Sequence, residues 1–204
     1  VGRIILPQVN AIRDLLDGDA CCVVVKETQL TAAMENMRKK PALVVTDSQA
    51  FAEVDAMIPA DVPLTGFSVL MARHRGQFET QVAGARAIGN LRPGDRVLVA
   101  ESCTHHPVQD DIGRVKLPRW LNQKVGGELI FDTVQGHDFP DDLSTYQLVV
   151  HCGGCTMNRQ EIQSRLSTCT RADVPATNYG LAIAFCLGIF DRALAPFETS
   201  VGAP

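Results

Sequence analysis

Short apolar runs alternate with helical segments along most of the chain, and this alternation constrains the fold more than any other sequence feature. The apolar runs, several of them rich in valine, lie at 20–26, 41–47, 61–68, 95–101, 128–134 and 146–152. Runs of this kind are typical of strands buried on both faces. Helical segments are predicted at 8–18, 28–40, 48–58, 67–90, 112–127, 159–172 and 178–194. The pattern therefore predicts an α/β protein with mostly parallel sheets flanked by helices.

The domain organisation follows from a break in this pattern. The stretch GNLRPGD at 89–95 combines Gly and Pro after a long helical region, which is typical of a connection. A length of 204 residues suits two small domains. We place the boundary within 66–94 and predict a domain at 1–75 and a second at 76–204. Each is expected to hold a small, mostly parallel sheet flanked by helices.

Composition excludes some classes of partner. The net charge is −4 and no basic cluster exceeds three residues, so a nucleic-acid partner is not expected. The most apolar stretch is too short for a membrane span of about 20 residues, and no secretory signal is visible. The seven cysteines are an odd number without the density of a secreted scaffold. We therefore expect a reducing cytoplasm, where clustered cysteines bind metals or perform chemistry.

Two of the apolar runs end in residues that bind metals. The run at 95–101 leads into the stretch ESCTHHP, and the run at 146–152 leads into HCGGC. If the two strands are parallel neighbours, both loops meet at the carboxyl edge of one sheet. The sulfurs of Cys103, Cys152 and Cys155 would then converge. Two glycines between the last two cysteines free the backbone to present both sulfurs to one centre.

The residue types allow three interpretations of this group of cysteines and histidines. Thiolates select zinc, copper(I) or iron–sulfur centres. The three cysteines and one histidine could hold structural zinc, or an iron–sulfur cluster with one iron whose ligand is not a cysteine. A third reading is a hydrolase that uses Cys103 and His105 as nucleophile and base.

The spacing Cys103-x-His105 and His151-Cys152-x-x-Cys155 resembles the C-x-H…H-C-x-x-C signature of the HydF family, the [FeFe]-hydrogenase maturation GTPases. Segments 2–17, 63–76, 106–121 and 152–166 also resemble that family. The resemblance implies a [4Fe–4S] cluster on the three cysteines. Candidates for its fourth ligand, or for donors to its sulfurs, are the neighbouring polar residues Glu101, His105, His106 and His151.

The resemblance also implies a function. Members of this family are scaffolds that accept a transient two-iron precursor and transfer it to apo-[FeFe]-hydrogenase. The implied partners are the radical-SAM maturases, the hydrogenase and a second copy of the chain, bound through the dimerisation domain at 1–75. The printed sequence contains no G-x-x-x-x-G-K-[ST] phosphate loop. We therefore expect a truncated member of the family that is not an enzyme; the alternative is a zinc-stabilised protein-interaction module.

Overall fold

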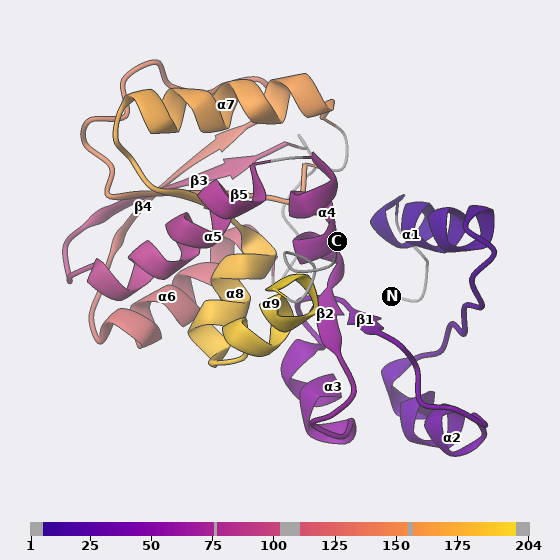
Figure 1. Cartoon of the computed structure of the whole chain (residues 1–204). Coiled ribbons are helices and arrows are strands. Elements are labelled where there is room, and N and C mark those ends of the chain that lie inside the picture. Colours follow the sequence, from indigo (N-terminus) through magenta and orange to yellow (C-terminus); the bar gives the residue numbers. More distant parts are fainter. Residues whose placement is uncertain (1–5, 76, 103–110, 155–156, 199–204) are drawn as a thin grey trace.

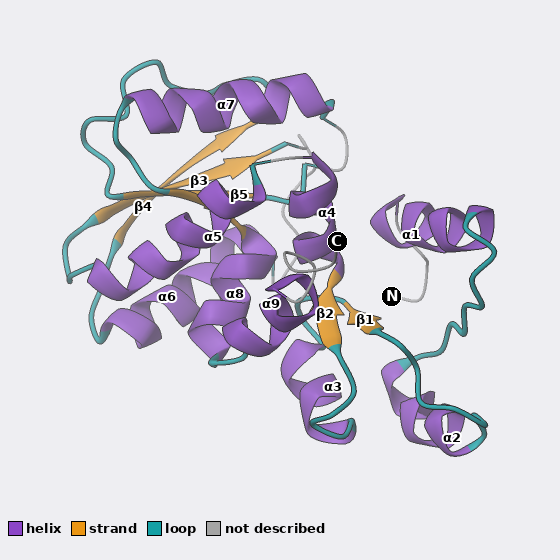
Figure 2. Ribbon diagram, viewed as in Figure 1, coloured by secondary structure: helices purple, strands orange, loops and turns teal. Residues whose placement is uncertain are grey.

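The computed structural model describes residues 6–75, 77–102, 111–154 and 157–198, and it has the predicted α/β architecture (Figure 2). The strands are β1 Val44–Thr46, β2 Leu64–Gly66, β3 Arg96–Glu101, β4 Ile130–Gln135, β5 Leu148–His151 and β6 Ala176–Asn178. The α-helices are α1 Leu6–Asp17, α2 Leu30–Glu35, α3 Phe51–Met57, α4 Phe67–Arg75, α5 Phe78–Ala87, α6 Leu117–Val125, α7 Arg159–Arg171, α8 Tyr179–Leu187 and α9 Phe190–Glu198. Short helical turns precede α2 at Glu27–Gln29, follow α5 at Ile88–Asn90 and precede α6 at Ile112–Lys116.

The larger sheet is parallel, with the strand order β4-β3-β5-β6 over the described residues. The chain leaves β3 for β4 on one side and later passes from β5 to β6 on the other side. The strand order therefore reverses between β3 and β5. Ligands of open parallel sheets bind beyond the carboxyl ends of the strands at such a switch point.

Helices cover both faces of this sheet (Figure 1). One face packs on α7, through Leu98 and Val149 against Ile162 and Leu166. The opposite face packs on α6 and α8 through a separate cluster that includes Val97, Leu121, Leu148, Val150 and Ile183. Because β3 and β5 are buried from both sides, their sequences are continuous apolar runs, as the sequence predicts.

The smaller sheet pairs β1 with β2 in parallel, and its core is shared with the C-terminal end of the chain. Phe51 and Leu64 pack in one cluster with Leu181, Phe190 and Leu194 from α8 and α9. In addition, the Thr65 hydroxyl donates a hydrogen bond of 2.9 Å to the carbonyl of Ala193. Residues on both sides of position 76 therefore form one hydrophobic core.

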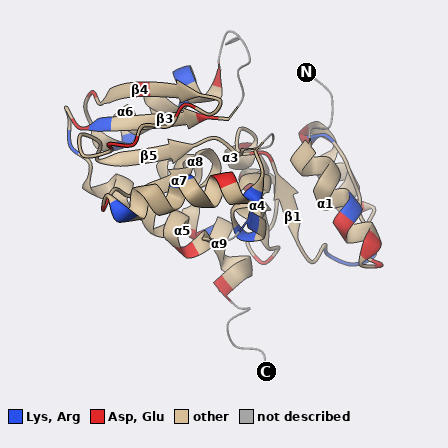
Figure 3. Cartoon of the chain, turned by 90° about the horizontal axis from the view of Figure 1, so that it is seen from above, with Lys and Arg blue, Asp and Glu red and all other residues tan. Residues whose placement is uncertain are grey.

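The N-terminal arm, residues 6–43, differs from the rest of the described chain because none of its residues is buried. It lies to one side in Figure 1 and again in Figure 3, where α1 contains both acidic and basic residues. The prediction of a buried strand at 20–26 is wrong. Residues 20–26 form no strand, and Val23 and Val24 are 59% and 57% exposed. A strand requires a neighbour to accept and donate its backbone hydrogen bonds, and the described residues supply none there.

Other differences from the predicted elements have local causes. The helix expected at 178–194 is two helices, because Gly188 adopts a φ of +76° and ends α8. The expected break near Pro118 is instead a helix start, where proline is tolerated. Strand β6 has only three residues and was not predicted.

Among the described residues, no single helix is both long and apolar enough to cross a membrane. The pair formed by α8 and α9 passes that test of length and composition, with a bend of 119° between its helices.

Candidate metal centre

The two ligand-bearing loops begin side by side at the carboxyl edge of the larger sheet. In the parallel register of β3 and β5, Ala100 is the partner of His151. The ladder continues one residue further, because the Cys152 amide donates a hydrogen bond of 2.9 Å to the Ala100 carbonyl. Both loops therefore start at the switch point of the sheet, as expected if the two strands are parallel neighbours.

The structure describes some of the predicted site residues and not others. Glu101, His151 and Cys152 are described. Cys103, His105, His106 and Cys155 lie outside the described residues. Within the described part, no group of three or more His, Cys, Asp or Glu side chains is placed to hold a metal ion.

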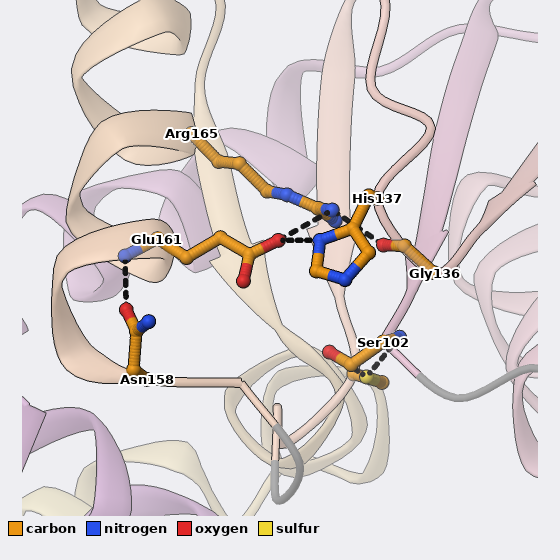
Figure 4. Close-up of polar contacts among 7 residues, drawn as sticks. Ser102, Gly136, His137, Asn158, Glu161 and Arg165 are labelled. Atoms are coloured by element: carbon orange, nitrogen blue, oxygen red, sulfur yellow. Dashed lines mark hydrogen bonds and ion pairs between the residues drawn. The ribbon is translucent and has the colours of Figure 1, made fainter.

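The Cys152 sulfur lies among polar groups of both loops. The amide of Ser102 donates to it at 3.0 Å, and the amide of Gly154 donates at 3.4 Å. The Cys152 thiol and the Ser102 hydroxyl are 2.9 Å apart (Figure 4). Backbone amides that converge on a sulfur offset the negative charge of a thiolate, and such hydrogen bonds are found around iron–sulfur ligands. The surroundings of Cys152 therefore fit a sulfur that ligates a metal centre.

His151 is 3% exposed and packs its ring against Phe139, with centroids 5.5 Å apart and planes 18° apart. Neither ring nitrogen has a hydrogen-bond partner among the described residues. Burial, with a smaller effect from the Arg165 cation, lowers the pKa of His151 to about 3. The imidazole is therefore neutral at physiological pH and keeps a free nitrogen lone pair.

Glu101 is 4% exposed and its carboxylate already has partners. Its Oε2 accepts hydrogen bonds from Gln135 Nε2 at 3.0 Å and from Arg114 Nη2 at 3.4 Å. The buried Tyr179 hydroxyl lies near the same carboxylate, and burial raises the pKa of this tyrosine. One of the two carboxylate oxygens of Glu101 is therefore already engaged by Gln135 and Arg114.

A second polar network joins Arg165, Glu161 and His137 and was not predicted (Figure 4). Arg165 is 4% exposed; its Nη2 donates to the Gly136 carbonyl at 2.5 Å and contacts Glu161 Oε1 at 3.4 Å. The same Glu161 oxygen lies 2.7 Å from His137 Nδ1. The guanidinium also stacks over Phe139 at 5.1 Å. The spacing of Glu161 and Arg165 by four residues on a helix is the sequence signal that would have indicated this pair.

A cavity of about 20 Å³ lies next to the Cys152 loop, large enough for roughly one water molecule. Its wall includes His151, Cys152 and Gly153 from the loop, together with Arg75 from α4 and Asn178 from the end of β6. The cysteine loop is thus in contact with helix α4, which precedes the predicted domain boundary.

Comparison with protein families gives two matches. The model described as the hydrogen maturase F dimerization domain matches residues 1–76. The model described as the hydrogen maturase F tetramerization domain matches residues 79–196, which is more than half of the chain. A comparison with curated proteins found no match.

Proposed function

The chain belongs to the hydrogen maturase F (HydF) family, and from this premise we propose that it is a scaffold without enzymatic activity of its own, which binds a [4Fe–4S] cluster. In this proposal the cluster lies at the shared rim of β3 and β5, on Cys103, Cys152 and Cys155. The protein receives a two-iron precursor there and passes it to apo-[FeFe]-hydrogenase. Membership of the family, which supports a role in hydrogenase maturation, confirms the resemblance seen in the sequence.

The observation that carries the cluster proposal is the position of the Cys152 sulfur. It accepts amide hydrogen bonds from Ser102 and Gly154, which directly precede Cys103 and Cys155 in the sequence. A centre bound to Cys152 is therefore adjacent to Ser102 and Gly154, the last described residues before the other two cysteines. When bound, a cluster with three cysteine ligands supplies an iron whose fourth position can exchange.

His151 and Glu101 have different prospects as the fourth ligand. His151 is neutral and has no hydrogen-bond partner on its ring nitrogens among the described residues, so binding a metal would satisfy a buried polar group. The Oε2 atom of Glu101 already accepts hydrogen bonds from Arg114 and Gln135, so one of its two oxygens is occupied. We therefore propose His151 ahead of Glu101, with His105 as the remaining candidate. Replacing each singly and recording the spectrum of the cluster tests this order.

Self-association follows from the family models, and the structure offers a surface for it. The N-terminal arm exposes Leu6, Val9, Leu15 and Leu16 on α1, and Val23–Val25 beyond it. Contiguous exposed apolar residues mark interaction sites. We propose that a second copy covers this arm, and that the radical-SAM maturases and apo-hydrogenase bind the assembled protein in the cytoplasm.

The test is metal analysis of anaerobically purified and reconstituted protein. We expect iron and sulfide in equal amounts, a brown colour that air bleaches, and loss of both in Cys152→Ser. Cys21→Ser is the matched control, because Cys21 is an exposed cysteine of the N-terminal arm and its removal should leave the cluster intact. A colourless protein that holds zinc and unfolds with a chelator would instead establish the interaction-module alternative.

Transfer is tested separately. Protein that carries the cluster is incubated with a synthetic two-iron precursor, freed of excess precursor, and mixed with apo-hydrogenase. Activation of the hydrogenase by the loaded protein, and none by the Cys152→Ser variant, is the expected result. Equal activation by both would refute the carrier role.

A further inference from the structure

Arg75 joins two parts of the chain that are far apart in sequence. It is the last residue of α4, inside the segment matched by the dimerization model. Its Nη1 donates to the carbonyl of Gly153 at 2.9 Å and to the carbonyl of Gly154 at 2.5 Å. These two glycines are the middle of the C-x-x-C loop. One guanidinium nitrogen therefore holds two consecutive peptide groups of the loop.

The backbone of the same residue is held by the helix that follows the loop. The Arg75 carbonyl accepts hydrogen bonds from Arg159 Nε at 2.9 Å and from Gln163 Nε2 at 3.1 Å, both on α7. Arg75 thus contacts the loop through its side chain and α7 through its main chain. Arg75 therefore links the loop to the helix that follows it.

Gly154 fits closely against Arg75. It adopts a φ of +61°, which side chains disfavour. A Cβ atom at this position would lie 2.6 Å from Arg75 Nη1 and 2.8 Å from Ile162 Cδ1. The turn and the guanidinium are therefore in direct contact, and the Gly154 amide in that turn is the one that donates to the Cys152 sulfur.

We propose that Arg75 is a positioning residue that couples the cysteine loop to the N-terminal segment. It fixes the Gly153–Gly154 turn so that the Cys152 sulfur keeps its amide donor, and it places a positive charge beside the loop. Helix α4 also packs against α1 of the exposed arm. A second copy bound to that arm would therefore contact an element that packs on the helix carrying Arg75. The part of the inference that concerns a bound cluster rests on the proposed function.

The first test needs no metal. Hydrogen exchange of the Gly154 amide is measured by NMR in the metal-free chain, in Arg75→Ala and in Arg73→Ala. Arg73 is the matched control: it lies on the same helix with the same charge, but it is exposed and stacks over Phe197 at 5.3 Å. We expect exchange at least about tenfold faster in Arg75→Ala and unchanged in Arg73→Ala, because only the former frees the turn.

Arg75→Lys distinguishes a specific loss of hydrogen bonds from a general loss of fold, because lysine keeps a cationic donor at the same position. We expect protection between that of the original protein and that of Arg75→Ala. If Gly154 exchanges equally fast in the original protein and in both Arg75 variants, Arg75 does not position the loop and the inference fails.

The second test uses the reconstituted cluster and reads its reduction potential. A nearby cation favours the more negative, reduced cluster, so Arg75→Ala should shift the midpoint potential downward and Arg75→Lys should restore most of the shift. Arg73→Ala should leave the potential unchanged. A purely structural role for Arg75 would give no recovery with lysine.

The two proposals fail in different ways. If the original protein binds neither iron nor sulfide, the proposed function falls, and the exchange experiment still decides whether Arg75 holds the loop. If the cluster is present but potential and exchange are the same in Arg75→Ala as in the original protein, the inference about Arg75 falls and the proposed function stands.

Discussion

Two valine-rich runs of similar composition differ in burial: one is exposed and the other is buried. The run at 20–26 contains three consecutive valines, and Val23–Val25 are exposed without any strand. The run at 146–152 forms β5, whose residues Leu148, Val149 and Val150 are fully buried. Local sequence favours a strand in both places. The difference is that β5 has β3 and β6 as neighbours and helices on both faces, whereas the described chain offers the N-terminal run no neighbour.

Within the described residues no residue of the N-terminal arm is buried, whereas β5 is covered on both faces. The family match to a dimerization domain over residues 1–76 makes a second copy the natural partner. The same apolar sequence would then contribute to the core of one chain in β5 and to an interface in the arm. Substitutions in the two regions should therefore affect different properties.

The largest effect is expected from a charge in the buried run. Val150→Asp places a carboxylate at a position that is 0% exposed and pairs with Val99. Because Val150 packs in an apolar cluster with Leu148 and Ile183, we expect a loss of more than about 4 kcal/mol and an unfolded chain. Circular dichroism with urea titration measures this.

Val24→Asp is the matched change in the exposed run. Its carboxylate stays in water within one chain, so we expect normal secondary structure but weaker self-association in sedimentation experiments. Unfolding as severe as that of Val150→Asp would show that the arm is buried within the single chain, and would contradict the comparison.

A smaller effect is expected where helices α8 and α9 pack against the smaller sheet, β1–β2. Phe190 on α9 is 5% exposed and packs in the cluster with Phe51 and Leu64. Phe190→Ala should lower the free energy of unfolding by about 3 kcal/mol, through lost burial and the cavity it leaves. Urea denaturation at low protein concentration measures the change.

The control for this substitution is Leu16→Ala in α1, where the side chain is 55% exposed. We expect a change within about 0.5 kcal/mol for the dissociated chain. Equal costs at the two sites would mean that α9 is not part of the core of the smaller sheet.

The pH dependence of the free energy of unfolding should differ between buried or half-buried cysteines and exposed cysteines. Burial raises the pKa of the Cys169 and Cys186 thiols to about 12, from an ordinary value of 9.0. Between these values the unfolded chain loses thiol protons that the folded chain keeps. The free energy of unfolding therefore falls as pH rises above 9, by up to about 1.4 kcal/mol per pH unit for each thiol. Below pH 9 these thiols leave the stability unchanged.

Urea midpoints between pH 8 and 10.5 measure this slope. The double variant Cys169→Ala with Cys186→Ala should show a shallower decline than the original protein. Cys21→Ala should not, because Cys21 is exposed in both the arm and the unfolded chain. Three identical slopes would show that the buried thiols ionise as readily as free ones.

The smallest effect is expected on the surface of α1. Arg13 and Asp17 form an ion pair one helical turn apart, with side chains 73% and 54% exposed. Such pairs contribute at most about 0.5 kcal/mol and are screened by salt. Asp17→Asn should therefore change the urea midpoint of the dissociated chain very little. A loss above about 1 kcal/mol would mean that this helix is more firmly held than its exposure indicates.

Much of the larger sheet was predictable because β3 and β5 are continuous apolar runs. The runs that became β3 and β5 were located correctly, and the structure meets the condition that they are parallel neighbours. Strand β6 was missed because its residues, Ala-Thr-Asn at 176–178, do not form an apolar run. The stop at Gly188 was missed because apolar residues continue across it, from Leu187 to Ile189 and Phe190, so the two helices resemble one in the sequence.

The candidate site was predictable in residue type but not in arrangement. The C-x-x-C spacing singled out Cys152, and its position after a strand indicated the edge of the sheet. No local signal linked Arg75 to Gly153 and Gly154, which are nearly eighty positions away. Nor could the sequence show that the carboxylate of Glu101 is held by Arg114 and Gln135.

By itself the sequence determined the alternation of strands and helices, the thiol and imidazole groups at the two strand ends, and the family to which the chain belongs. Tertiary structure alone decided which of the two valine-rich runs is buried. It also decided that α9 packs against the smaller sheet and that Arg75 binds the cysteine loop. The physical reason is that backbone preference and side-chain chemistry belong to each residue, whereas burial and hydrogen bonding belong to its neighbours in space.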